Sequence, residues 1–256
     1  MSHEFEGQVV IITGAAGGIG RACVREFHGL GACVFMVDID PQGAAFAGEF
    51  ATDRVVFHKT DLSSSEDIRG LFDAAVERFG RIDVLVNNAA LIEPMHAVHE
   101  TSEKDLERIL AVNLQGPFLC CKYAYPHLRR THGCIINVSS MAGVAGEASH
   151  AAYSTAKGGL NALTKAMAID YGKDGIRSNA ICPSSVLTPT TDAMIARMPN
   201  AQEIVAYRTK VNHLGYTASP EEIARVVAFV ASPGASFITG AVIPVSGGSE
   251  CGYGVK

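Results

Sequence analysis

Short runs of consecutive apolar residues alternate along the chain with longer stretches in which apolar positions recur every three or four residues. The short runs are rich in valine and isoleucine, which favour strands, and they lack the strict alternation of a half-exposed sheet. The longer stretches have the spacing of helices with one buried face. The expected strands cover residues 9–12, 33–37, 55–58, 84–86, 134–138, 178–181 and 242–245, and the expected helices cover residues 18–30, 41–50, 65–79, 102–128 and 153–171.

This order of elements predicts a fold class. Strands that alternate with helices pair in parallel and bury both faces of the sheet under helices. We therefore expect an α/β protein: a single Rossmann-type domain over residues 1–256, with a doubly wound parallel seven-stranded sheet and helices on both faces. The least regular stretch, residues 184–215, follows the sixth strand. We interpret it as a substrate lid, although a plain insertion would have the same composition.

Composition excludes several functional classes. The net charge is −5 and no lysine- or arginine-rich run occurs, so nucleic acid is not expected as a partner. No apolar run reaches the roughly 20 residues that span a bilayer, and the first eight residues do not resemble a secretory signal. The seven cysteines include no Cys-x-x-Cys pair and are expected to be buried free thiols of a cytoplasmic protein. His96 and His99 lack a supporting cluster of ligands, so we expect no metal site.

A glycine-rich segment, TGAAGGIG over residues 13–20, follows the first strand and opens the first helix. Glycines there permit a tight turn and let a pyrophosphate approach the free N–H groups of the helix N-terminus. Asp38 ends the second strand, 18 residues after Gly20. A carboxylate at that place accepts hydrogen bonds from ribose hydroxyls and repels a 2′-phosphate. Each feature alone has a purely structural explanation, but together they predict a dinucleotide site selective for NAD.

Tyr153 and Lys157 are four residues apart and share one face of the expected helix. A phenol with a pKa of about 10 is a poor base at neutral pH, and a neighbouring ammonium favours the phenolate. The pair can then take the proton of an alcohol, although the same spacing is ordinary helix surface in most proteins. Ser140 follows the fifth strand, at the sheet edge that faces the ligand crevice, where its hydroxyl can orient the substrate oxygen.

These segments together resemble the short-chain dehydrogenase/reductase family over essentially the whole chain. Further matching motifs are Asp61-Leu62, Asn87-Asn88-Ala89-Ala90, Arg177-Ser178-Asn179 and Ile238-Thr239-Gly240. The resemblance implies a catalytic tetrad of Asn113, Ser140, Tyr153 and Lys157, in which Asn113 holds a water of a proton relay behind Lys157. It also implies a set of cofactor contacts: Gly14, Gly18, Ile19, Gly20, Asp38, Asp61, Leu62, Asn88, Tyr153, Lys157, Val186 and Thr188.

Three positions depart from the family pattern. Ala90 and Ser246 replace a common glycine and a common aspartate, and both changes are expected to affect packing only. Ser184 replaces the glycine of a Pro-Gly pair near the expected nicotinamide pocket, where it can alter ring placement. The family's NADP users carry a basic residue at the positions of Gly17 or Ile39, and the absence of one here agrees with NAD.

The resemblance leaves three functions open: a sugar or polyol dehydrogenase, a dehydrogenase of steroids or other lipophilic alcohols, and a non-catalytic nucleotide-binding module. The complete tetrad argues against the third. The run over residues 249–256 is similar to the tail of the group that includes L-fucose dehydrogenase and 17β-hydroxysteroid dehydrogenase type 14. That likeness keeps the first two functions open and suggests that Tyr253 enters a neighbouring subunit's pocket. The family also pairs through its long helices, which implies a homotetramer, although the small residues of helix 153–171 could simply pack on the sheet.

The loops after the fourth and fifth strands carry Glu93, His96, Glu147 and His150. An apolar steroid site would leave such carboxylates unpaired at a cost, whereas a sugar offers hydroxyls to pair with them. We therefore predict NAD-dependent oxidation of a secondary or hemiacetal hydroxyl of a sugar or sugar acid, an L-fucose-type aldose or a keto-deoxy sugar acid. Glu93, Glu147, His150 and Tyr253 are the predicted substrate contacts, a 17β-hydroxysteroid-type activity is the alternative, and all four could instead be solvated residues.

Overall fold

Seven parallel strands form the centre of the molecule, in the spatial order β3-β2-β1-β4-β5-β6-β7. The computed structural model describes residues 4–251. The order reverses between β1 and β4, and in such sheets ligands bind beyond the carboxyl ends of the strands at this point. The sheet confirms the predicted fold class. The strands are β1 (Val9–Thr13), β2 (Cys33–Asp38), β3 (Val55–Lys59), β4 (Val84–Asn87), β5 (Cys134–Val138), β6 (Arg177–Pro183) and β7 (Val242–Val245).

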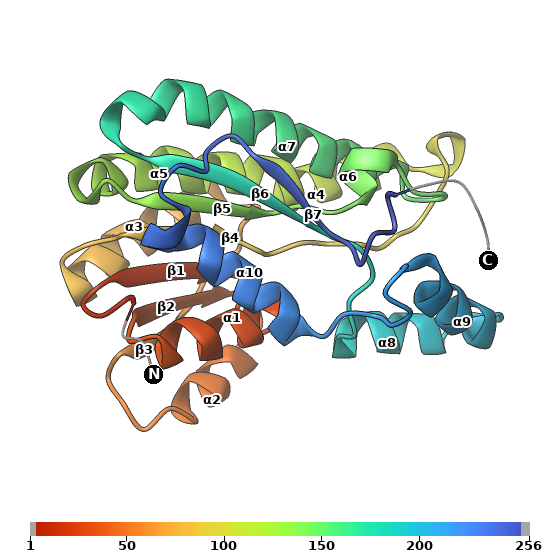
Figure 1. Ribbon diagram of the computed structural model, residues 1–256, viewed down its shortest axis with the longest axis horizontal. Coiled ribbons are helices and arrows are strands. Elements are labelled where there is room, and N and C mark those ends of the chain that lie inside the picture. Colours follow the sequence, from red (N-terminus) through yellow and green to blue (C-terminus); the bar gives the residue numbers. More distant parts are fainter. Residues whose placement is uncertain (1–3, 252–256) are drawn as a thin grey trace.

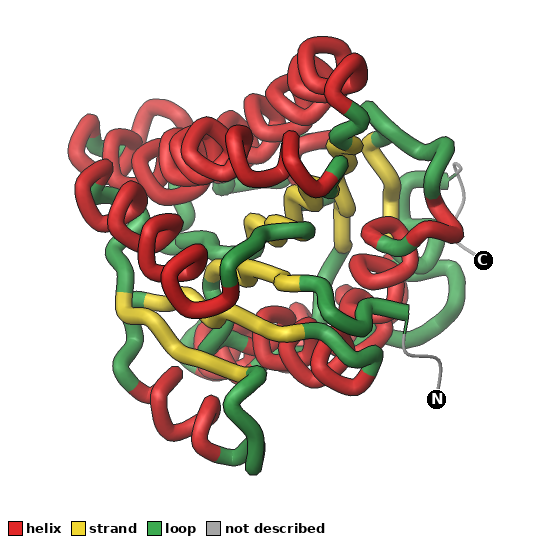
Figure 2. Tube along the Cα trace, turned by 90° about the vertical axis from the view of Figure 1, so that its left-hand side faces the viewer, coloured by secondary structure: helices red, strands yellow, loops and turns green. Residues whose placement is uncertain are grey.

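Helices cover both faces of the sheet (Figures 1 and 2). One face packs against α1, α2 and α10, and the other against α3, α5 and α7. Strands β1, β4 and β5 are buried along their whole length, which explains why their sequences are apolar without alternation. The helices of the described chain are α1 (Gly18–Gly29), α2 (Gln42–Gly48), α3 (Ser65–Phe79), α4 (Glu103–Leu110), α5 (Gly116–Thr131), α6 (Ala142–Ala145), α7 (Ala151–Tyr171), α8 (Pro189–Ala196), α9 (Ala201–Val211) and α10 (Pro220–Ala231).

Local signals set several helix ends. Ser64 accepts a hydrogen bond from the Asp67 N–H and so caps the start of α3, and Gly80 ends that helix in the left-handed conformation at φ 76°. Ser219 and Glu222 form a capping box at the start of α10. The prediction from sequence omits α10, although this cap is visible in the chain, and it also omits the single turn of α6.

The predicted long helix over residues 102–128 is present, but it is not regular. It is divided into α4 and α5 by a π-helical turn, Ala111–Gln115. Pro117 has no N–H to return to the carbonyl of Asn113, so the regular ladder cannot continue through this point. The Asn113 side chain is drawn to the backbone of Leu91 instead of lying on the helix surface. Such turns are frequent at functional sites, and this one carries a member of the expected tetrad.

The stretch 184–215 is more regular than expected. It contains α8, which is capped by Thr188, and α9, and both helices lie past the carboxyl ends of the strands, away from the two helix layers (Figure 1). The Pro, Met and polar residues that make the sequence look irregular are compatible with two short helices. No helix among residues 4–251 is long and apolar enough to cross a membrane.

Candidate active site

The glycine-rich turn between β1 and α1 is shaped by backbone contacts that exclude side chains. Gly14 has φ 65°, and a Cβ atom there would lie 2.7 Å from Ala89 Cα. A Cβ on Gly20 would overlap the Gly14 carbonyl oxygen, and one on Gly18 would lie 2.6 Å from Thr188 Cβ. Within the described chain no side chain caps the N-terminus of α1. The turn is therefore a narrow cradle beside the uncapped N-terminus of α1, which fits a pyrophosphate.

Two side chains hold this turn in place. The Asp38 carboxylate accepts hydrogen bonds from the Ala16 N–H at 2.8 Å and from the Asp40 N–H at 3.0 Å. The Asn88 amide donates to the carbonyl oxygens of Thr13 at 2.9 Å and Gly14 at 3.1 Å. Asp38 thus lies beside the turn with a partly open carboxylate, whereas the Asn88 side chain positions the loop.

Tyr153 and Lys157 lie one turn apart near the start of α7, and the Lys157 Nζ atom is 5.7 Å from the centre of the Tyr153 ring. Lys157 is buried, and its ammonium donates to the carbonyl oxygen of Val138, at the end of β5, at 2.8 Å. Ser140 forms a hydrogen bond with the Tyr153 phenol, and its Oγ atom also accepts from the Ala142 N–H at 3.1 Å. The structure therefore brings these three predicted residues together at the carboxyl end of β5.

Burial shifts both titratable groups of this cluster away from their charged forms. It raises the pKa of the Tyr153 phenol to about 12, with the Ser140 hydrogen bond opposing the rise and the Glu147 carboxylate adding to it. Burial also lowers the pKa of the Lys157 ammonium to about 8. The phenolate is therefore disfavoured in the free protein, so a base at Tyr153 needs a further positive charge nearby, such as an oxidised nicotinamide ring.

Asn113 lies beside this cluster but does not line the cavity described below. Its amide group accepts from the Leu91 N–H and donates to the Leu91 carbonyl, both at 2.7 Å. Both polar atoms of the side chain therefore connect the π-helical turn to the segment after β4. Its expected part in a water relay stays a prediction.

A single cavity of 1480 Å³ joins the glycine-rich turn to the tyrosine and lysine. This volume exceeds the roughly 300–1,000 Å³ of a common small-molecule pocket, and so has room for a dinucleotide with a substrate. Most predicted site residues line it: Gly14, Gly18, Ile19, Gly20, Asp38, Asp61, Leu62, Asn88, Ser140, Glu147, His150, Tyr153, Lys157, Val186 and Thr188.

The predicted substrate contacts separate into three groups. His150 and Glu147 line the cavity; the His150 ring lies 6.1 Å from the Tyr153 ring, and its Nδ1 atom is 4.0 Å from the Glu147 carboxylate. Glu93 is not among the lining residues and forms an exposed ion pair with Arg197 at 3.3 Å. Tyr253 lies outside the described residues.

Several cavity residues escaped sequence reasoning. They come mainly from residues 184–215 and from the residues after β7, with Met141 from the loop after β5, and these positions have no recognisable motif. Arg208 is the most conspicuous, because it is a buried guanidinium on α9. The others that matter below are Met141, Met194, Met198, Ile204 and Glu250.

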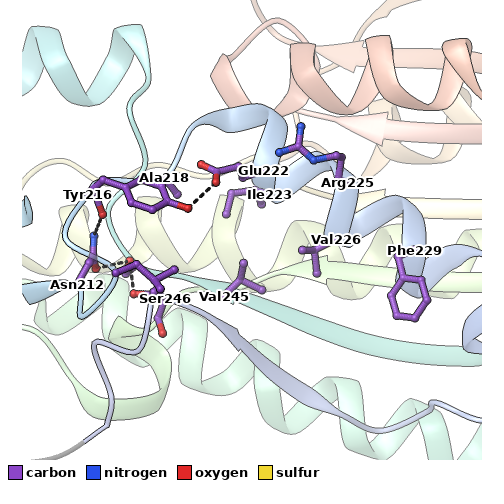
Figure 3. Close-up of a pocket in the computed structure, with 13 residues that line it drawn as sticks. Asn212, Tyr216, Ala218, Glu222, Ile223, Arg225, Val226, Phe229, Val245 and Ser246 are labelled. Carbon is purple, nitrogen blue, oxygen red and sulfur yellow. Dashed lines mark hydrogen bonds between the residues drawn. The ribbon is translucent and has the colours of Figure 1, made fainter.

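A second pocket of 450 Å³ lies between α10 and the residues after β7 (Figure 3). There the Tyr216 hydroxyl donates to the Glu222 carboxylate at 2.8 Å, and Asn212 donates to the Tyr216 carbonyl at 2.8 Å. Ser184 lines both cavities. Its hydroxyl donates to Asn212 Oδ1 at 3.2 Å and to the Ser246 carbonyl at 3.3 Å, so residues of the second pocket hold it.

A family model described as enoyl-(acyl carrier protein) reductase matches residues 14–250. L-fucose dehydrogenase of Oryctolagus cuniculus is 38% identical, with 98% of this chain and 88% of that protein covered. Meso-2,3-butanediol dehydrogenase of Serratia marcescens is 41% identical, with 98% of each chain covered. Cis-4-hydroxycyclohexanecarboxylate dehydrogenase of Sinomonas cyclohexanicum is 37% identical, with 97% and 98% covered.

Two solved structures extend the likeness to three dimensions. Levodione reductase superposes with a TM-score of 0.92 at 31% identity, with 97% of this chain and 100% of that chain covered. A 3-ketoacyl-(acyl-carrier-protein) reductase from Brucella melitensis, complexed with NADH, superposes with a TM-score of 0.86 at 30% identity, with 96% and 99% covered.

Proposed function

Because the chain belongs to the short-chain dehydrogenase/reductase family, we propose that it is an NAD-dependent dehydrogenase of a sugar or sugar acid. It oxidises a secondary or hemiacetal hydroxyl, as in an L-fucose-type aldose or a keto-deoxy sugar acid. The observation that carries the proposal is the single cavity in which Tyr153, Lys157 and Ser140 face the same space as the glycine-rich turn and Asp38.

The residues of the chain supply the proton chemistry. When bound at the glycine-rich turn and Asp38, a nicotinamide cofactor would supply the hydride acceptor for the oxidation. Ser140 orients the substrate hydroxyl, and Tyr153 takes its proton, leaving a carbonyl group. The Lys157 ammonium, held by the Val138 carbonyl, stabilises the phenolate while it exists. Asn113 acts indirectly, through the segment after β4 that it fixes and through the water relay that the family resemblance implies.

The preference for NAD is supported by charge. The Asp38 carboxylate lies beside the cradle and would repel a 2′-phosphate. We expect Asp38→Ala to lower the NAD/NADP ratio of kcat/KM by about 10- to 100-fold, the range of a hydrogen bond to a charged group. Steady-state kinetics with both cofactors measures this ratio. Efficient use of NADP by the wild-type enzyme would refute the electrostatic argument.

The polar substrate is supported by the carboxylate and imidazole that line the cavity near Tyr153, Glu147 and His150. It is also supported by the relatives, whose names specify a sugar, a diol and a hydroxy acid. The deciding experiment is a panel of sugars, sugar acids and steroids assayed with NAD by NADH absorbance. Turnover of steroids above that of every sugar and sugar acid would refute the proposal.

A lipophilic alcohol, as in 17β-hydroxysteroid-type dehydrogenases, is the second candidate. The observation in its favour is that several apolar side chains, three of them methionines, line the cavity. Methionine side chains adapt to apolar ligands of irregular shape. The residues concerned are Met141, Met194, Met198 and Ile204.

We also propose that the enzyme is a cytoplasmic homotetramer and that residues 184–215 act as its substrate lid. Phe118 on α5 and Ile169 on α7 are exposed large apolar side chains on the two helices expected to pair. Part of the small-residue surface of α7 is used within the subunit, because a Cβ on Gly159 would lie 2.9 Å from the Leu114 side chain. The free cysteines fit a reducing compartment. Light scattering at micromolar concentration tests the assembly, and a monomer would refute it.

A further inference from the structure

Arg208 is a buried cation that the proposed chemistry does not use. It lies on α9, lines the same cavity as Tyr153, and leaves only 8% of its side chain exposed. A guanidinium carries five N–H donors, and burying it is costly unless these donors find acceptors. Among residues 4–251 its guanidinium donates one hydrogen bond, to the Val186 carbonyl at 2.8 Å. It also forms an ion pair with Asp192 at 3.6 Å, longer than a hydrogen bond, and Asp192 is more than half exposed.

Two carboxylates that line the cavity do not accept hydrogen bonds from the Arg208 guanidinium. Glu250 contacts the Ser246 hydroxyl, and Glu147 lies beside His150. Both have partners other than Arg208. Among residues 4–251, the other lysine and arginine side chains that line the cavity are Lys157 and Arg108, and Arg108 is exposed on α4. Arg208 is therefore the buried positive charge that still has donors for an anion in the cavity.

We propose that Arg208 binds the carboxylate of the substrate, so that the enzyme acts on a hydroxy acid rather than on a neutral sugar. This inference rests on the proposed dehydrogenase function and narrows it. The planar fork of a guanidinium matches a carboxylate with two parallel hydrogen bonds, which gives orientation as well as attraction. With the acid group held at α9, the hydroxyl to be oxidised lies in the cavity that Ser140 and Tyr153 also line. Arg208 is thus a specificity-determining residue.

The anion could also come from a cofactor phosphate, and the Val186 contact could be purely structural. Matched substrate pairs separate these alternatives. We choose six-carbon sugar acids, gluconate, galactonate and fuconate, each with its neutral amide, together with the parent sugars. Wild-type enzyme, Arg208→Gln and Arg208→Lys are compared, with dissociation constants for NAD measured by titration. Arg197→Gln is the control, because this arginine of the lid segment is exposed and pairs with Glu93.

We expect the wild-type enzyme to favour an acid over its amide by about 10- to 100-fold in kcat/KM, mainly through KM. Arg208→Gln removes this preference, Arg208→Lys retains part of it, and Arg197→Gln leaves it unchanged. NAD affinity stays within about twofold in all variants, since the charge acts on the substrate.

Three results would overturn the inference. Oxidation of neutral sugars without a preference for acids contradicts it and leaves the proposed function intact, whereas turnover of neither class contradicts the proposed function itself. Equal losses for acid and amide in Arg208→Gln, with a lowered Tm, assign Arg208 to the Val186 anchor alone. A loss of NAD affinity with the acid preference unchanged assigns the anion to the cofactor.

Discussion

The two halves of the large cavity are built in different ways. The nucleotide half is fixed by close backbone contacts, Gly14 against Ala89 and Gly20 against the Gly14 carbonyl, together with the local hydrogen bonds of Asp38 and Asn88. The substrate half, formed by residues 184–215 and 249–250, is fixed by side chains that reach across from distant segments, such as Arg208 to the Val186 carbonyl. A Cβ atom on Gly14 or Gly20 would meet backbone atoms at less than 3 Å, so the first construction restricts substitution at these positions.

The residues proposed for the chemistry belong to neither of these segments. Tyr153 and Lys157 come from α7, and Lys157 is held by the end of β5 rather than by residues 184–215. A common proton acceptor can therefore serve different substrates, because the residues that select the substrate are separate from those that perform the reaction.

The largest expected effect tests this separation. Tyr153→Phe removes only the phenol oxygen, and a positioned acid or base contributes about 10²- to 10⁴-fold. We expect kcat to fall by that factor while the dissociation constant for NAD stays nearly unchanged. Steady-state kinetics and cofactor titration measure the two quantities. If more than a tenth of wild-type turnover remains, Tyr153 is not the acid/base.

Lys157 gives the next effect, on stability rather than rate. Burial disfavours its ammonium and lowers its pKa from the ordinary value of 10.5 to about 8 in the folded protein. The unfolded chain then binds more protons between these values, so wild-type stability rises with pH from about 8 to 10.5, by roughly 3 kcal/mol. Lys157→Met lacks this contribution. Denaturant unfolding without cofactor measures the free energy of unfolding of both proteins. The value for Lys157→Met relative to the wild type should be greatest near pH 7 and should decrease toward pH 10. Parallel pH profiles for the two proteins would contradict this assignment.

A glycine pair on one helix tests the rigidity of the nucleotide half. Gly20→Ala forces a Cβ against the Gly14 carbonyl, and overpacking of this kind costs about 1–3 kcal/mol. Gly29→Ala, at the other end of α1, meets nothing within 4 Å and should be neutral or slightly stabilising. Thermal unfolding and NAD titration compare the two variants. We expect loss of cofactor affinity only for Gly20→Ala, and equal behaviour would mean that the close approach is not required.

The smallest effect concerns Glu147, which lines the cavity from the loop after β5. Glu147 is half-exposed, so solvent weakens its contribution. We expect Glu147→Ala to raise KM for the best sugar or sugar acid by about 3- to 10-fold, with Glu147→Gln retaining part of the contact. Kinetics with the best steroid is the control. Our view of the substrate fails if the wild-type enzyme prefers the steroid and Glu147→Ala increases that preference.

The same contrast explains what the sequence could predict. The sheet, the glycine-rich turn, Asp38 and the Tyr153–Lys157 pair all leave a fixed spacing in the chain, because each depends on local geometry. Arg208 was missed because nothing local distinguishes it from a surface arginine of a helix. The folded chain brings it beside Val186, a contact across 22 residues.

Two other differences between the prediction and the structure concern the π-helical turn and the direction of Glu93. The π-helical turn follows from Pro117 and from the attraction of Asn113 to Leu91, and only the first is visible in sequence. Glu93 was grouped with Glu147 because both follow a strand, yet its loop directs it to Arg197 at the surface. A position at the correct edge of a sheet does not determine the direction of a side chain.

The burial of the cysteines has a consequence for chemical labelling. Burial raises the pKa of the Cys23 and Cys121 thiols to about 12 and that of Cys134 to about 11. Thiol reagents attack the thiolate, so these groups are inert at neutral pH. Cys251 is the exposed cysteine of the described chain, and it follows Glu250 of the cavity wall directly. The natural sequence thereby provides an attachment point for a fluorophore beside the cavity, where its emission can report on occupancy without any engineered residue.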